Sequence, residues 1–499
     1  MDTQDTSSSI FSRVKKAYGW IIFGKGSGMF LTIFYTPIII TQLGNNYGLI
    51  AVGSLISYFI QTMIDAVSAW TYNNESKKNI RSNEVIGAKL NFYLITFTIL
   101  IIIVIWTLTI VFLNSSINSK FEIDQNLLIY FLITLCLAQI STFLVQQFEV
   151  INYVKHSFYI LQRVGVIRKW IGVATVLIFY FTQSKIIILT IIFAHLAETL
   201  FILLIYRKII KTYNLRNFDS NSFLKELLDD NFFKFIFSHI FSGGAIYFVL
   251  FGFSYLVTAF YDSEYISGAA AVMVIFNTII VFASFLTKPL YSLLSENFYS
   301  QIDEVKSFIK KDKDFLIQRI FNISIFISLL SFIFVYFFGT YILNLWLGGL
   351  HSSFYQLLII CSCAFVAIIP SRSVSYSLLF SGKMFFPALI TYLISALIYT
   401  YINLGNNINL KTIAMIYVLG AGLSCIASSS LAFMSTNASK RNIFYSSALM
   451  FISLVSCILC LSNANSIKIA GLLILAFLLL LILYLERNSI VWALKLIKK

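Results

Sequence analysis

Charged residues are scarce in this chain of 499 residues: they make up 11% of it, whereas 59% are hydrophobic, and the mean hydropathy is +0.86. A soluble globular domain carries about 25% charged residues, so the composition excludes that class. Apolar stretches of roughly 20 residues cross a bilayer as helices. We therefore expect an all-α polytopic membrane protein.

Fourteen apolar runs reach spanning length. They are 17–41, 47–70, 88–113, 126–148, 165–182, 185–206, 233–260, 265–288, 319–344, 353–381, 384–403, 410–434, 443–463 and 467–485. The fifth is the weakest, because Arg168 and Lys169 shorten its apolar core. No small-residue cleavage site follows the first run, which predicts a retained helix rather than a signal peptide.

Basic residues are rare on one side of the predicted spans. Of the 36 Lys and Arg, Lys25 lies inside the first span and four fall in external segments, which leaves 31 on the cytoplasmic side. Loops rich in Lys and Arg stay in the cytoplasm, so we expect both termini there and the chain in the cytoplasmic (inner) membrane. The net charge of +15 then reflects topology and anionic lipid, and we expect no nucleic-acid partner.

A charged segment divides the first twelve spans into six and six. We therefore expect an N-terminal lobe at 1–206, a cytoplasmic linker at 207–232, a C-terminal lobe at 233–434 and two peripheral helices with an interfacial tail at 435–499. The fourteenth span is apolar on all sides. The tail places apolar residues on one face and lysines on the other, which is typical of an interfacial helix.

The chain also lacks the usual signatures of an enzyme or an ATPase. Gly19, Gly24 and Lys25 fit the start of a phosphate-binding loop, but residue 26 is not Ser or Thr and the motif lies in a membrane helix. The external loops are short and carry no plausible catalytic set. We expect no enzyme, no cofactor and no ATP use, although a membrane-embedded glycan polymerase or glycosyltransferase stays as an alternative of a different class.

Cysteine is rare, and all six cysteines lie in predicted spans, where they behave as small apolar residues. Cys457 and Cys460 form a CxxC without a second ligand pair. We expect neither a disulfide framework nor a metal site.

The first span nevertheless carries a lysine. Lys25, Gly28, Thr32 and Thr36 follow the spacing of one helix face. Burying Lys25 costs about 2.5 to 3.5 kcal/mol on insertion scales, which favours a wet cavity behind this face. The alternative is a lysine that snorkels to the cytoplasmic headgroups.

Other polar side chains extend this predicted cavity. These side chains form polar stripes on the second and fourth spans and occupy single positions on the seventh and eighth. The candidates are Gln61, Asp65, Gln139, Gln146, His239 and Asn277. Asp65 lies near the cytoplasmic end, so solvation there is the alternative. His239 follows Ile236-Phe237-Ser238 as Lys25 follows Ile22-Phe23-Gly24, a weak internal repeat. Lys288 shares a face of the eighth span with Asn277 and ends that span, just before Pro289 and a second charged cytoplasmic loop. The alternative for Lys288 is an anchor that snorkels to the headgroups.

The deepest charges are His195 and Glu198, one helical turn apart in the sixth span. An acid and an imidazole at this spacing can share a proton or hold a cation, which makes them candidates for ion coupling. An interhelical hydrogen-bonded pair that only holds the bundle together is an equal alternative.

The tenth span is the least apolar, because IIPSRSVSYS places Pro370, Arg372 and four serines within ten residues. A proline frees a carbonyl and bends a helix, and an arginine inside a membrane needs a cavity or an anion. Arg372 is therefore a second cationic candidate, with the cytoplasmic mouth as its alternative place.

Four short motifs follow one another along the chain: TPIIITQLGNNYGL at 36–49, TKPLYSLLSE at 287–296, ILNLWLGG at 342–349 and SGK at 381–383. Taken in this order, they resemble the motifs of Wzx-type polysaccharide (O-antigen) flippases of the MATE-like superfamily. The resemblance implies two pseudo-symmetric six-helix lobes plus two C-terminal helices. It also implies alternating access that moves an undecaprenyl-diphosphate-linked oligosaccharide to the external leaflet, for O-antigen (lipopolysaccharide) biosynthesis, capsule or another glycan.

The resemblance further implies a cationic cavity for the diphosphate, which it assigns to Lys25, Arg372 and Lys288. As partners of the protein, the resemblance implies the lipid-linked substrate, membrane lipids and a glycan polymerase machinery. The chain itself would be a monomer. A lipid II flippase and a cation-coupled drug exporter of the same superfamily are the alternatives; an exporter of cations would need an acidic rather than a basic cavity.

Overall fold

In the computed structural model of this chain, the structure describes the second part of the sequence more fully than the first. Described are 187–212, 230–299, 303–347, 354–379, 385–404, 408–435 and 440–498, together with short pieces before 187, chiefly 36–40, 43–48 and 170–175. The regular elements of these residues are all helices, which confirms the all-α fold class. The number of fourteen spans stays a prediction.

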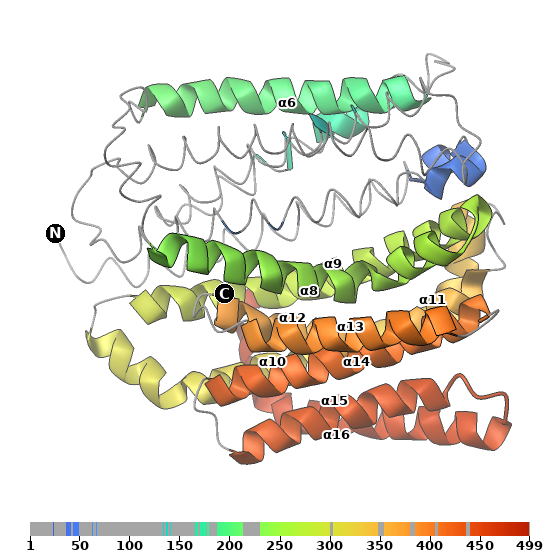
Figure 1. The fold of residues 1–499 in the computed structure, drawn as a ribbon. Helices are drawn as coiled ribbons and strands as arrows, with labels where there is room; N and C mark the ends of the chain where they lie inside the picture. The colour runs from blue at the N-terminus through green and yellow to red at the C-terminus, as the bar shows by residue number, and fades with distance from the viewer. Residues whose placement is uncertain are drawn as a thin grey trace. The chain divides into compact units, whose positions relative to one another are not determined.

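Ten α-helices and one short 3-10 helix make up the described elements. They are η1 (Gly44–Tyr47), α6 (Ile187–Thr212), α8 (Asp230–Phe260), α9 (Ser263–Tyr299), α10 (Asp303–Leu347), α11 (Tyr355–Ser362), α12 (Phe365–Leu379), α13 (Phe385–Leu404), α14 (Leu410–Ser435), α15 (Lys440–Leu459) and α16 (Asn465–Lys498). Figure 1 shows them along the chain.

Six described helices are long and apolar enough to cross a membrane. Their apolar parts are Phe233–Phe260, Ser263–Ala283, Gln318–Trp346, Leu410–Leu431, Asn442–Leu459 and Asn465–Arg487. Each coincides with a predicted span to within a few residues. Length and hydropathy alone therefore locate these helices correctly, as the physics of a hydrocarbon core about 30 Å thick requires.

The predicted tenth span consists of two helices. α11 and the first part of α12 meet at an angle of 48°, and the break falls at Cys363 and Ala364, more than a turn before Pro370. Pro370 itself lies inside α12. The bend was expected at the proline, but the structure places it where the Cys363 and Ala364 N–H groups bond in the tighter i→i−3 pattern to Ile360 and Cys361.

The second charged cytoplasmic segment is not a loop, contrary to expectation. α9 continues past Pro289 to Tyr299, and α10 begins again at Asp303. Val305, Phe308 and Ile309 keep helical spacing between the charges, and acidic residues at the start of α10 suit the positive end of its dipole. The charges dominated the sequence-based expectation and concealed this periodicity.

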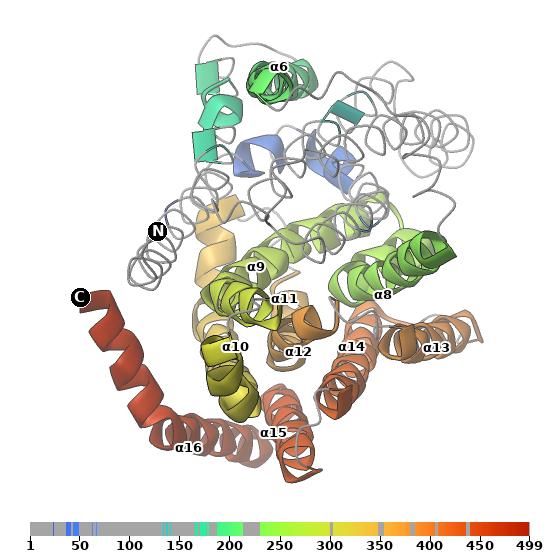
Figure 2. The ribbon, with the colours of Figure 1, turned by 90° about the vertical axis from the view of Figure 1, so that its left-hand side faces the viewer.

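The chain divides into two compact units. One comprises Met1–Ile240 and Tyr261–Ala270, and the other comprises Phe241–Phe260 and Ala271–Lys499. In the second unit α12 packs against α10 and α14, α14 also against α13 and α15, and α16 against α15 and α10 (Figure 1 and Figure 2). The predicted division at 207–232 and 435 stays a prediction.

Two tyrosines fasten α8 to α13 and α14 within the second unit. Tyr392 on α13 donates to the Phe241 carbonyl over 3.0 Å, and the fully buried Tyr417 on α14 donates to the Val249 carbonyl over 2.6 Å. The hydroxyl or ring of each tyrosine lies against a glycine three residues further along α8, Gly244 or Gly252. In an apolar interior these bonds satisfy hydroxyl groups that would otherwise be costly to bury.

Candidate functional site

The structure describes five of the predicted site residues: His195, Glu198, His239, Asn277 and Arg372. Six others lie outside the described residues: Lys25, Thr32, Gln61, Asp65, Gln139 and Gln146. Lys288 lies on the α9 backbone, but its side chain is also outside the described part of the chain. The five described residues fall in both compact units, so each unit is considered by itself.

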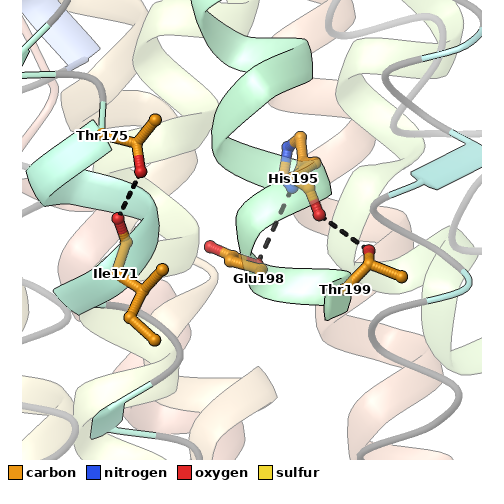
Figure 3. A network of polar contacts seen from close by, with 5 residues as sticks. All are labelled: Ile171, Thr175, His195, Glu198 and Thr199. Atoms are coloured by element: carbon orange, nitrogen blue, oxygen red, sulfur yellow. Dashed lines mark hydrogen bonds and ion pairs between the residues drawn. The ribbon is translucent and has the colours of Figure 1, made fainter. Parts of the chain in front are cut away.

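His195 and Glu198 lie one turn apart on α6 and face each other (Figure 3). His195 Nδ1 is 3.8 Å from Glu198 Oε2, with side-chain exposures of 26% and 12%. This distance is an ion-pair contact but too long for a hydrogen bond. The Nδ1 atom is buried and has no hydrogen-bond partner among the described residues. A small movement of the Glu198 carboxylate towards Nδ1 would bring the two groups into hydrogen-bonding distance.

A glycine on the neighbouring helical segment 170–175 makes room for Glu198. A Cβ atom built at Gly172 would overlap the Glu198 carboxylate oxygen Oε1. Figure 3 shows Glu198 directed from α6 towards the segment that holds Ile171 and Thr175. Thr175 donates back to the Ile171 carbonyl over 2.8 Å, and Thr199 does the same to His195 over 2.7 Å, so neither hydroxyl group competes for the carboxylate.

The sequence analysis did not identify Gly172. A single glycine in an apolar run is a common feature of membrane helices, where small residues allow backbones to approach. What distinguishes Gly172 is the buried carboxylate opposite it, and that pairing depends on which face of each helix meets the other. The predicted span 165–182 gives no such information.

His239 lies half-buried on α8, and its ring stacks on Phe235 one turn earlier, with 5.8 Å between centroids and 24° between planes. A stacked imidazole has its apolar face covered while its nitrogens stay at the ring edge. Its predicted role in a cavity stays a prediction.

Asn277 lies half-buried on α9 in the second unit, next to Phe276. Phe276 stacks on Phe365 at the start of α12, with 4.9 Å between ring centroids. Arg372 follows Phe365 by seven residues, so both project from the same face of α12. Asn277 and Arg372 thus belong to two helices that touch in the second unit through the Phe276 and Phe365 rings.

Arg372 is half-buried on α12, two residues after Pro370 in the broken span. The neighbouring Ser371 is buried, and both Ser371 and Arg372 lie near the buried Cys425 thiol of α14. Among the described residues, no carboxylate lies within ion-pair distance of Arg372. A guanidinium in this setting can bind an anion in a bidentate manner.

Chemically, the described site residues can do two different things. The first unit holds an acid and an imidazole that can take up a proton or a cation. The second unit holds a guanidinium that fits a phosphate or carboxylate group. The six cysteines are free thiols, and the described residues contain no group of three or more acids, histidines and cysteines able to hold a metal ion.

No protein-family model matches the sequence, and no curated protein matches it. Solved structures do. A MOP-superfamily transporter from Pyrococcus furiosus aligns with a TM-score of 0.62 at 13% identity, over 86% of this chain and 96% of that one. The MATE transporter VcmN from Vibrio cholerae, in a single-residue variant, aligns with a TM-score of 0.57 at 13% identity, over 88% and 100%.

A multidrug-resistance MATE transporter in an outward-facing conformation aligns with a TM-score of 0.55 at 12% identity, over 86% of this chain and 95% of that one. Likenesses at this identity concern the fold and leave the substrate open. The chain therefore has the fold of these MATE and MOP-superfamily transporters.

Proposed function

We propose that this protein is a flippase that moves an undecaprenyl-diphosphate-linked oligosaccharide from the cytoplasmic to the external leaflet by alternating access, without ATP. In this proposal it resides in the inner membrane with both termini in the cytoplasm, works as a monomer, and serves O-antigen or a related glycan pathway. The MATE fold supports transport in general. The substrate is inferred from charge and from the resemblance of the motifs.

The observation that carries the proposal is Arg372. It is a half-buried guanidinium on a broken membrane helix, and the described residues offer it no carboxylate. A permanent cation at membrane depth needs a compensating anion, and a diphosphate group supplies oxygen pairs that match the guanidinium. Lys25 is proposed as its counterpart on the first helix, with Lys288 as a further cation.

The fold by itself does not decide the charge of the substrate. The Pyrococcus furiosus neighbour has a binding pocket of reversed polarity, which suggests a different function for that transporter. Pockets of more than one polarity therefore occur in this fold. The proposed basic pocket would favour an anionic lipid over the alternative substrate, a cation carried by an exporter.

His195 and Glu198 are proposed to couple transport to a cation or proton gradient. The two half-buried side chains lie 3.8 Å apart, so a proton or a cation bound by either group changes the net charge of the pair. A purely structural pair is the alternative. Glu198→Gln separates the two, because it keeps the shape and removes the charge.

The direct test is a flipping assay in proteoliposomes with a fluorescent undecaprenyl-diphosphate sugar. A charge-assisted hydrogen bond contributes about 1.5 to 3 kcal/mol, so Arg372→Ala should reduce flipping about 10- to 100-fold. Lys25→Ala should also reduce the flipping rate. Arg372→Lys should retain only part of the rate of the unaltered protein. Arg487→Ala is the matched control, because Arg487 is exposed and stacks on Tyr484.

Two outcomes would contradict the proposal. If Arg372→Ala flips the lipid as fast as the unaltered protein, the cation has no role in substrate binding. If the unaltered protein exports a cationic drug and leaves the diphosphate lipid in place, the exporter alternative is correct. Lipid II run in parallel separates the two flippase specificities.

A further inference from the structure

A buried carboxylate lies near the end of the last membrane helix, where the sequence analysis expected only an interfacial tail. Glu486 on α16 is 5% exposed. Its Oε1 accepts a hydrogen bond of 2.9 Å from Asn322 Nδ2 on α10, and its Oε2 lies 4.0 Å from Arg319 Nε on the same helix. The flanking Leu485 and Arg487 are exposed, so only this residue of the three faces α10.

The contact extends to a third helix through side-chain hydrogen bonds. Gln318 on α10 donates to Asn322 over 3.2 Å and accepts a bond of 3.2 Å from Ser446 on α15. A continuous chain of bonds thus runs from α15 through α10 to α16. Figure 2 shows these three helices as neighbours.

Stability alone does not explain a charged contact here. Replacing a buried ion pair by well-packed apolar residues is often neutral or stabilising. α16 carries apolar side chains on all of its faces. Its exposed face includes Leu473, Phe477 and Leu480, and its buried face includes Leu475, Leu478 and Ile482. A helix with such a uniform surface can rotate or slide at little cost, whereas a single buried polar group can fix the register of helices.

We propose that Glu486 and Asn322 set the register of α16 against α10, that is, its rotation about its axis and its depth in the membrane. Arg319 compensates the charge, and Gln318 carries the constraint on to α15. The C-terminal hairpin is then a fixed part of the second unit rather than a pair of loosely attached peripheral helices. This inference does not depend on the proposed substrate.

The opposite end of α16 provides a reporter for this register. The Lys468 ammonium lies 5.5 Å from the centroid of the Tyr336 ring on α10, and Tyr336 donates over 3.3 Å to the Cys460 carbonyl. Lys468 and Glu486 are 18 residues apart, or about 27 Å along the helix. A rotation permitted by the loss of Glu486 is transmitted along a rigid helix to Lys468.

The test places the photo-crosslinker p-benzoylphenylalanine at Tyr336 in the full-length protein and locates its adducts on α16 by mass spectrometry. In the otherwise unaltered chain, we expect adducts centred on Lys468. Glu486→Leu should spread them over a helical turn and reduce the share at Lys468. Glu486→Gln retains an acceptor for Asn322 and should keep most adducts in place. Arg487→Gln, at the exposed neighbour, is the matched control.

The same experiment is repeated with Asn322→Leu, which removes the other partner of the hydrogen bond to Glu486. This variant serves if Glu486→Leu does not fold. Folding is checked by a monodisperse elution profile, so that a shifted adduct pattern reports register and not unfolding. Adducts that stay at Lys468 in a folded Glu486→Leu or Asn322→Leu protein would overturn the proposal. In that case, close packing such as that of Gly471 against Cys460 would set the register.

Discussion

Replacing Gly172 by alanine tests the geometry of the acid and imidazole pair most sharply. The added methyl group would overlap Oε1 of Glu198, which is 12% exposed and lies beside the segment that carries Gly172. Overpacking of this kind costs about 1 to 3 kcal/mol. The overlapped atom ends a flexible side chain, and alanine has a higher helix propensity than glycine by about 1 kcal/mol. We therefore expect Gly172→Ala to lower the free energy of unfolding by about 0 to 2 kcal/mol, measured by denaturant titration of the purified protein in micelles.

A double-mutant cycle separates this clash from any general effect of the substitution. Glu198→Ala removes the colliding carboxylate, so in that background Gly172→Ala should raise the free energy of unfolding by up to about 1 kcal/mol through its higher helix propensity. The coupling energy between the two substitutions should then be about 1 to 3 kcal/mol. Gly44→Ala is the control: Gly44 has φ 53° and no atom near its Cβ position, so its cost arises from backbone strain and should not depend on Glu198. Additive effects of Gly172→Ala and Glu198→Ala would refute the contact.

Two further predictions concern the second unit. Tyr417→Phe removes the hydroxyl group that donates to the Val249 carbonyl over 2.6 Å and should lower the free energy of unfolding by about 0.5 to 1.5 kcal/mol; an unchanged value would mean that this bond does not hold α8 to α14. Asn409 caps α14 by accepting a bond of 2.8 Å from the Thr412 N–H, so Asn409→Ala should cost about 1 kcal/mol in the same titration, whereas Asn409→Asp should not.

The sequence predicts the positions of the six described candidate membrane helices to within a few residues, because burial in hydrocarbon requires a fixed length of apolar helix. The helices that contain Phe233–Phe260 and Leu410–Leu431 begin and end close to the predicted residues. The charged segment into which α9 and α10 extend was wrongly expected to be a loop. It contains many charged residues, and its helical spacing of apolar residues is weak. The break at Cys363 contains no proline or glycine, so the sequence gives no local signal for it.

Contacts between helices are less accessible from the sequence. His195 and Glu198 could be paired from their spacing on a single helix, and the structure confirms that they lie together. Gly172 and the partnership of Glu486 with Asn322 depend on which faces of different helices meet. No local pattern encodes that choice, so the sequence analysis missed both, and Glu486 was placed in a tail.

The central claim is that a basic pocket recognises a diphosphate, and direct binding to the purified protein tests it most directly. Native mass spectrometry should show that the unaltered protein retains undecaprenyl diphosphate in preference to undecaprenyl monophosphate, and that Arg372→Ala loses this preference. Equal retention of both lipids by the unaltered protein, or an undiminished preference in Arg372→Ala, would contradict the account.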